Sequence, residues 1–206
     1  TKLTTGKRIN TSSDDAAGMS VGTKMDSKIR GLQMAVRNTL DGQSMVETGE
    51  TVLGEVVDIL QRIRELAVQT ANGTYGDDER DKVAVEIDEL VLELDRISDS
   101  TKFNGLNLLD GTATDITLQV GSDKGEVLTL DFPSVKSDDL GVDAIDISDS
   151  DKAQDTIETL DDALSLILDE RSRLGATVNR LQYTVSNLNT MIENISSAHS
   201  RIMDTN

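Results

Sequence analysis

The chain has 206 residues and a formal net charge of −18 at pH 7, with 38 acidic and 20 basic side chains. This acidity argues against nucleic acid and against an anionic membrane surface as partners, because both carry negative charge themselves. There is no cysteine, so disulfides and thiolate metal sites are excluded. Aromatic residues make up only 2% and there is a single proline, which favours an elongated helical bundle over a compact globule.

The N-terminal third predicts one long helix. Residues 1–12 are small and polar and predict a loop, and residues 12–15 then offer capping side chains and first-turn acids. Apolar residues follow at heptad spacing without a proline, so the helix is expected to run to about Thr70. The turn after it is predicted at residues 71–76, where Asn-Gly and a second glycine supply positive φ.

A shorter helix is expected from about Asp78 to Asp99, with acids near its start, and Phe103-Asn104-Gly105 is expected to end it. Residues 112–150 change character. Apolar and polar residues alternate over 116–120 and again over 128–132, which predicts a β-hairpin. The acidic segment 134–150 that follows is predicted to be a connector.

The last quarter, 151–206, carries the clearest pattern in the chain. Its stripe residues alternate at spacings of three and four, and all are apolar except Arg171 and His199. This heptad repeat predicts one long helix, capped by Ser148 or Ser150, that needs partner helices because a lone amphipathic helix is unstable in water.

These elements predict a mainly α fold. The expected architecture is an elongated antiparallel bundle or coiled coil of two long helices and one shorter helix, with a small β-hairpin region. The expected parts are 1–111, a short region 112–150 with the β-hairpin, and 151–206. Both chain ends should lie at one end of the bundle and the hairpin near the other. Such a narrow bundle leaves no room for a deep ligand cavity.

The sequence gives no support for an enzyme, a metal or a cofactor. His199 is the single histidine, and its place on the apolar stripe favours a partly buried structural role. Arg171, on the same stripe, is expected to pair with a carboxylate or extend its head to water. The acidic cluster of Asp146, Asp149 and Asp151 suggests a calcium site, but the glycine and the terminal glutamate of an EF-hand loop are missing. They are expected to be solvated connector charge.

One feature of the first helix is predicted to face outward. With Leu60 on the seam, Asp58, Arg62, Leu66 and Gln69 are predicted to lie roughly on the opposite side. An isolated exposed leucine is common and usually means nothing. Next to Arg62 in an acidic chain, it is equally a candidate contact for another molecule.

Several short motifs resemble bacterial flagellin, the subunit of the flagellar filament. They cover about 1–111 and 151–206, and are GKRIN (6–10), DDAAG (14–18), IRGL (29–32), AVRN (35–38), LQRIRELAVQ (60–69), ANGT (71–74), EID (86–88), DRI (95–97), FNG (103–105), LLDG (108–111), LGA (174–176), NRL (179–181) and SAHSRI (197–202). The middle is where flagellins vary.

The resemblance implies a structural rod domain whose subunits stack side by side into an extracellular filament that serves motility. It also implies two terminal helices required for polymerisation. Both are expected to be missing here, so a soluble, monomeric rod-domain fragment is expected. Implied partners are other flagellin subunits, a flagellar export chaperone and the filament cap, with secretion by flagellar type III export and no cleaved signal. A hook–filament junction protein shares this helical plan and is the alternative.

The resemblance also implies two sites of host recognition. Toll-like receptor 5 binds this family on the rod, and the matching positions here are Arg62, Leu66, Gln69 and Glu86. Plant flagellin-sensing receptors read the peptide that matches residues 1–22, in which Asp14, Asp15 and Gly18 are retained.

Overall fold

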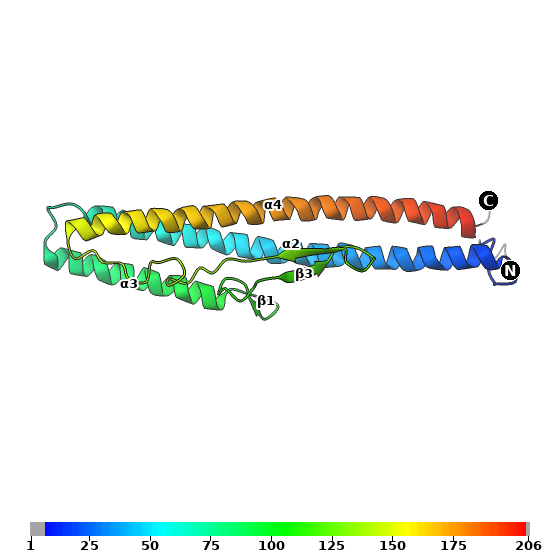
Figure 1. The fold of residues 1–206 in the computed structure, drawn as a ribbon, viewed down its shortest axis with the longest axis horizontal. Coiled ribbons are helices and arrows are strands. Elements are labelled where there is room, and N and C mark those ends of the chain that lie inside the picture. Colours follow the sequence, from blue (N-terminus) through cyan, green and yellow to red (C-terminus); the bar gives the residue numbers. More distant parts are fainter. Residues whose placement is uncertain (1–6, 205–206) are drawn as a thin grey trace. The chain divides into compact units, whose positions relative to one another are not determined.

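The computed structural model describes residues 7–204, within which three helices account for most of the chain (Figure 1). They are α2 (Ala16–Thr70), α3 (Asp77–Ser100) and α4 (Ser150–Met203). Two long helices and one shorter helix are therefore confirmed, with ends within a few residues of those predicted. At about 1.5 Å per residue, α2 and α4 are each roughly 80 Å long.

Two short strand pairs complete the fold. β1 (Lys102–Phe103) pairs antiparallel with β2 (Leu106–Asn107), and β3 (Ile116–Gln119) pairs with β4 (Val127–Leu130). The second pair is the predicted hairpin. The first was not predicted, because two-residue strands are too short to show alternation. Its turn, Asn104-Gly105, has positive φ at both residues (48° and 83°), as two-residue hairpin turns require.

The start of α4 corrects a prediction about its cap. The residue before the helix is Asp149, whose carboxylate accepts a hydrogen bond from the backbone N–H of Lys152 at 2.8 Å. Asp149 is therefore the N-cap, in place of the predicted Ser148 or Ser150. Ser150 instead donates its hydroxyl to the carbonyl of Ala71 at 2.6 Å, which fastens the start of α4 to the end of α2.

The chain divides into two compact units. Unit 1 consists of Thr1–Ser44, Thr117–Thr129 and Asn179–Asn206, and unit 2 of Met45–Ile116 and Leu130–Val178. Both long helices contribute to both units, whereas α3 and the β1–β2 pair belong to unit 2 alone.

In unit 2, α2 and α4 run antiparallel. The Arg171 guanidinium donates to Glu50 at 2.6 Å and that of Arg64 donates to Asp161 at 2.6 Å, so rising numbers on α2 meet falling numbers on α4. The first pair confirms the expectation that Arg171 finds a carboxylate. The fully buried side chains of this unit come from all three helices and the connector; among them are Leu53, Leu60, Ile63, Leu94, Leu108, Leu109, Val135, Leu160 and Ile167.

In unit 1, the segments next to both chain ends lie together, as predicted. The N–H of Arg8 donates to the carbonyl of Met203 at 2.7 Å, and Lys7 forms an isolated antiparallel bridge with Asp204. The buried cluster of this unit is small. Leu32, Ala35 and Leu188 form it, with Val36, Met191, Ile192 and Ile195 packed around it half-buried.

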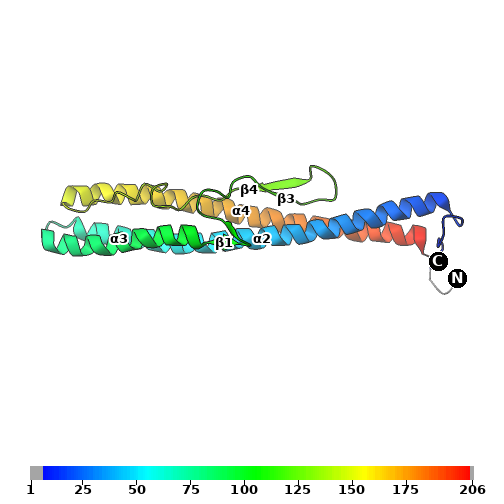
Figure 2. The same ribbon diagram turned by 90° about the horizontal axis from the view of Figure 1, so that it is seen from below.

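The hairpin is not where the sequence placed it. Its residues 117–129 belong to unit 1, the unit that holds both chain-end segments, so the prediction that it lies near the other end is wrong. The Asn38 amide donates to the carbonyl of Gln119 at 3.2 Å, and Leu118 packs over Gly42 of α2. Figure 2 shows the ribbon of β3 and β4. The missing side chain at Gly42 makes room for Leu118, which fixes the hairpin there.

Candidate functional site

The clearest polar surface shared by two helices lies on α2 and α3 of unit 2. Arg62 donates to Oε1 of Glu86 from Nε at 3.0 Å and from Nη2 at 2.7 Å, and its Nη1 lies 3.3 Å from Glu65. Both side chains of the Arg62–Glu86 pair are about half exposed, at 49% and 47%. The hydrogen bond to Glu86 is the largest cause that raises the pKa of Arg62. We refer to Arg62, Glu65, Gln69 and Glu86 as the Arg62 surface.

The turn between α2 and α3 sets the spacing of this surface. Gln69 is exposed and donates its amide to the Tyr75 hydroxyl at 2.6 Å. Arg80 is buried and donates to the carbonyls of Asn72 and Tyr75 at 3.3 and 3.4 Å. These bonds tie the turn to the first part of α3, and Glu86 therefore comes to lie opposite Arg62. Sequence reasoning named Arg62, Gln69 and Glu86 but not Arg80, which carries no motif.

Leu66 does not face outward, and that prediction is wrong. The residue is only 2% exposed. It lies about 40° from Arg62 around the helix axis, at the edge of the face that Leu60 and Ile63 define. A single partner helix would have left this edge in solvent. In unit 2, α2 is flanked by α3 on the Arg62 side and by α4 on the Arg64 side, so its buried face widens and takes in Leu66.

The acidic pair at the start of α2 is engaged by the backbone. Asp14 accepts hydrogen bonds from the N–H groups of Asn10 and Thr11 at 3.1 and 3.2 Å. Asp15 precedes α2 and accepts from the N–H of Gly18 at 2.9 Å, which makes it the N-cap. A side chain at Gly18 would collide with Asp15 and Ile9. The structure thus brings the three candidate residues together in one turn, where each has a structural role.

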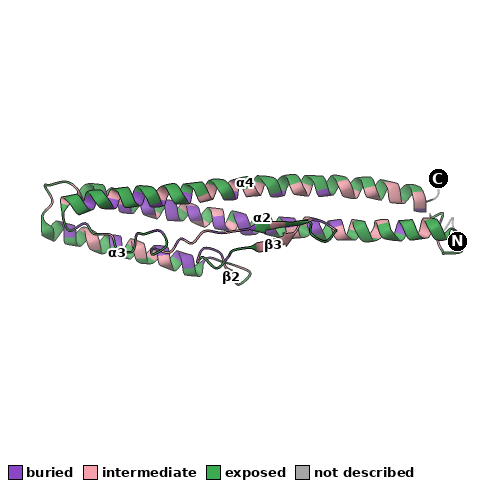
Figure 3. Cartoon of the chain, viewed as in Figure 1, coloured by how far each residue is buried: buried purple, intermediate pink, exposed green. Residues whose placement is uncertain are grey.

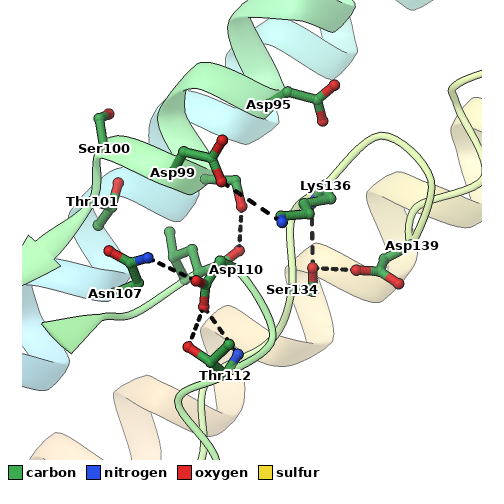
Figure 4. A network of polar contacts seen from close by, with 12 residues as sticks. Asp95, Asp99, Ser100, Thr101, Asn107, Asp110, Thr112, Ser134, Lys136 and Asp139 are labelled. Carbon is green, nitrogen blue, oxygen red and sulfur yellow. Dashed lines mark hydrogen bonds and ion pairs between the residues drawn. The ribbon is translucent and has the colours of Figure 1, made fainter.

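A further polar network joins the end of α3 to the connector (Figure 4). Asp95 accepts from the N–H and hydroxyl of Ser137 at 2.8 and 3.0 Å. Asp110 accepts from the N–H and hydroxyl of Thr112 and from the Asn107 amide, and the bond from the Thr112 hydroxyl is the largest cause that lowers the pKa of Asp110. These bonds connect residues up to 42 positions apart, so the network fastens the connector to α3.

Among the remaining chemical candidates, the carboxylates of Asp146 and Asp149 accept structural hydrogen bonds. Asp146 accepts from Lys152 at 2.6 Å, and this bond, with the N–H and hydroxyl of Ser148, lowers the pKa of Asp146 to about 2. His199 is half-buried on α4. Over residues 7–204 no group of histidine and carboxylate side chains could hold a metal ion, and no helix is long and apolar enough to cross a membrane. The surface hollows around the connector are shallow, at about 200–330 Å³.

Comparison with known families decides the identity. Residues 1–114 match the bacterial flagellin N-terminal helical region, and residues 157–206 match the bacterial flagellin C-terminal helical region. The chain belongs to the bacterial flagellin family. It is a structural subunit of the flagellar filament, and therefore an extracellular motility protein and not an enzyme.

Individual relatives agree with this membership. The chain is 44% identical to the flagellin of Halalkalibacterium halodurans over 205 residues, which covers 98% of this chain and 75% of the relative. It is 39% identical over 219 residues to the flagellar filament 33 kDa core protein of Treponema phagedenis, covering 98% and 77%.

Solved structures share the fold. The crystal structure of Bacillus cereus flagellin matches with a TM-score of 0.66 at 34% identity, over 79% of this chain and 94% of that one. A putative flagellar hook-associated protein from Vibrio parahaemolyticus matches with a TM-score of 0.78 at 14% identity, over 93% and 100%. At that identity the likeness shows the fold alone, so the junction-protein alternative gains nothing beyond the shared helical plan.

Proposed function

We propose that this filament subunit is recognised by Toll-like receptor 5 through the Arg62 surface. The observation that carries the proposal is the half-exposed Arg62–Glu86 pair, which joins α2 and α3, with the exposed Gln69 seven residues further along α2. Arginine is enriched among residues that dominate binding energy, because its planar fork can bind several acceptors at once. Leu66 is not among the proposed receptor contacts, because it is buried. Its side chain packs in the core of unit 2 and holds α2 in place.

The test replaces both partners of the pair. Because each single replacement would leave one charge without its partner, the informative variant is Arg62→Ala/Glu86→Ala. We expect receptor binding to weaken by about tenfold or more, as for a central interface arginine. Arg64→Ala is the matched control: Arg64 is also a partly exposed arginine of α2 paired across helices, with Asp161 on α4, and its loss should leave binding within about twofold.

Binding of both variants should be measured with the purified receptor ectodomain, with circular dichroism to confirm that they fold. Equal affinity of the double variant and the parent would overturn the proposal. Leu66→Ala is a poor test, because truncating a buried leucine costs about 2–5 kcal/mol of stability and would weaken binding indirectly.

We also propose that the outward face of α3 contacts a neighbouring subunit in the filament. On the outward face of α3, Val85 and Leu92 lie one heptad apart and are 62% and 61% exposed. They are the most exposed large apolar side chains of α3, and contact sites between proteins are formed where exposed apolar side chains gather. We expect bacteria that carry Val85→Asp/Leu92→Asp in their own gene to form fewer and shorter filaments by electron microscopy, whereas Val85→Ala/Leu92→Met should form normal ones. Normal filaments in the aspartate variant would exclude this face.

The proposed export pathway is inferred from the family resemblance. We propose secretion by the flagellar type III apparatus, with an export chaperone and the filament cap as partners and no cofactor. Deleting the export apparatus should retain the protein inside the cell, and immunoblots of cell and medium fractions measure this. Its appearance in the medium of the deletion strain would contradict the route.

For plant receptors we propose recognition of the N-terminal segment only when it leaves the folded turn. In the fold, Asp14 and Asp15 accept backbone hydrogen bonds and are not free to bind a second protein in an extended conformation. We expect a synthetic peptide of residues 1–22 to bind more tightly than the folded chain. Tighter binding by the folded chain would contradict this. Residues 1–6 of the peptide lie outside the described residues.

A further inference from the structure

The sulfur atoms of this chain are unevenly distributed. There are six methionines and neither cysteine nor tryptophan, so methionine is the side chain most open to two-electron oxidation. Five of the six belong to unit 1: Met19, Met25, Met34, Met191 and Met203. Met45 opens unit 2. The unit with the small buried cluster therefore holds most of the oxidisable sulfur.

Two of these thioethers fill the contact between α2 and α4. Met191 is half-buried and packs against the cluster of Leu32, Ala35 and Leu188. Met203 is 8% exposed, and its sulfur lies over Gly22 of α2, where an added Cβ would come within 2.5 Å of it. Gly22 thus allows the thioether to approach the α2 backbone closely. Both methionines are part of the packing that joins the two helices in unit 1.

Oxidation would change this contact chemically. A thioether sulfur attacks one oxygen of a hydroperoxide such as H₂O₂; the O–O bond breaks, an S=O group forms, and water leaves. The sulfur is oxidised by two electrons and the peroxide is reduced. The new oxygen is a strong hydrogen-bond acceptor, and burying it without a donor is unfavourable. Around Met191 the cluster residues Leu32, Ala35 and Leu188 offer only apolar side chains.

We propose that Met191 and Met203 form an oxidation site through which hydroperoxides loosen the α2–α4 pair of unit 1 and leave unit 2 intact. Few other side chains are buried among the described residues of unit 1, so a polar oxygen at two of the contacts between its helices has a large effect. Methionine-sulfoxide reductases reverse the reaction, and the change is therefore a reversible covalent modification.

The experiment treats the folded chain with H₂O₂, locates sulfoxides by peptide mass spectrometry and measures amide hydrogen exchange. We expect sulfoxide at Met191 and Met203, and exchange about tenfold faster in 22–44 and 179–203, as for one buried acceptor left unpaired. Exchange in 53–67 and 153–174 should not change. Treatment with MsrA and MsrB together should restore the original rates.

Two variants serve as controls. Met191→Leu/Met203→Leu keeps the side-chain volume and should remove the response to peroxide. Met34→Leu should keep the response, because Met34 is 47% exposed and its sulfur accepts a hydrogen bond from Arg37, outside the helix contact. The proposal fails if both sulfoxides form without faster exchange in unit 1, or if Met34 is oxidised while Met191 and Met203 stay reduced. A leucine double variant that responds like the parent would overturn it as well.

Discussion

The two units use the same two long helices but differ in how much they bury. Fully buried side chains are concentrated in unit 2, on α2, α3 and the connector, while the part of α4 that belongs to unit 1 is mostly intermediate or exposed (Figure 3). In unit 1 the buried apolar side chains among the described residues are Ile9, Leu32, Ala35, Leu181, Leu188 and Met203.

The difference follows from what covers the helix pair. In unit 2, α3 and the connector add further apolar residues above α2, so Leu60 and Ile63 have no exposed surface. In the described part of unit 1 the short hairpin covers α2, which it contacts through Leu118, Gln119 and Asp123. A heptad stripe alone therefore does not determine stability, because the burial of each stripe residue depends on a third layer.

Truncating a buried leucine should show the difference in packing between the two units most strongly. Leu60→Ala in unit 2 is expected to cost about 4 kcal/mol and Leu188→Ala in unit 1 about 2 kcal/mol, because a cavity collapses more easily where neighbours are half-exposed. Urea denaturation followed by circular dichroism measures both. Equal losses would mean that the two units are equally well packed.

Three glycines of α2 give a second test. A Cβ at Gly49 would press on the buried ring of Phe132 at 2.7 Å, so Gly49→Ala should destabilise by about 1–3 kcal/mol. At Gly42 the obstacle is Leu118, which is half-buried and able to move, and the loss should be smaller.

Gly54→Ala is the matched control for these two variants. Its nearest side-chain atom is Nη2 of Arg171 at 3.8 Å, so alanine fits and should stabilise the helix by about 0.5–1 kcal/mol. Thermal unfolding curves should therefore rank the variants in the order Gly54, Gly42, Gly49. A Gly42 variant that loses more than the Gly49 variant would contradict the comparison.

The coupling energies of ion pairs should differ between the two units in the same direction, but by less. In unit 2 the Arg171 and Glu50 side chains are 33% and 36% exposed; in unit 1 those of Lys28 and Asp123 are 42% and 64% exposed, at 3.4 Å. Double-mutant cycles with Arg171→Met/Glu50→Gln and Lys28→Met/Asp123→Asn should give couplings of about 1 kcal/mol and about zero. A larger coupling in unit 1 would show that its hairpin is held electrostatically.

The smallest expected effect is a pH dependence in unit 2. The pKa of Asp146 is lowered from 3.8 to about 2, mainly by Lys152. A lowered carboxyl pKa stabilises the fold fully above the unfolded value and loses this contribution as the pH falls through the folded value. Asp146→Asn should therefore be less stable than the parent above pH 4, with the gap closing towards pH 2. A gap that stays constant down to pH 2 would contradict the role of Lys152.

Much of the fold could be predicted because the helices are encoded locally. The heptads of α2 and α4 and the Asn-Gly turn at 72–73 are visible in short windows, and so are the helix ends they imply. The partner of Arg171 could not be named, because Glu50 lies 121 residues away. The burial of Leu66 was missed for a related reason: it depends on α3 covering α2, which no repeat within α2 reveals.

The same limit applies to the candidate surface. Arg62, Gln69 and Glu86 were identified by resemblance, but their juxtaposition depends on Arg80, which binds two carbonyls of the α2–α3 turn. Alternating apolar and polar residues predicted the hairpin, but its position in unit 1 depends on the packing of Leu118 over Gly42. Tertiary contacts of this kind leave no periodic trace in a single sequence.

Amide hydrogen exchange of the untreated chain, read in overlapping peptides, tests the central contrast most directly. Both units rest on the same helices, and only unit 2 has the added layer of α3 and connector. We expect residues 53–67 and 160–174 to exchange at least about tenfold more slowly than residues 22–40 and 181–199. Equal protection in the two sets, or slower exchange in the second, would contradict the conclusion that the third layer holds this subunit together.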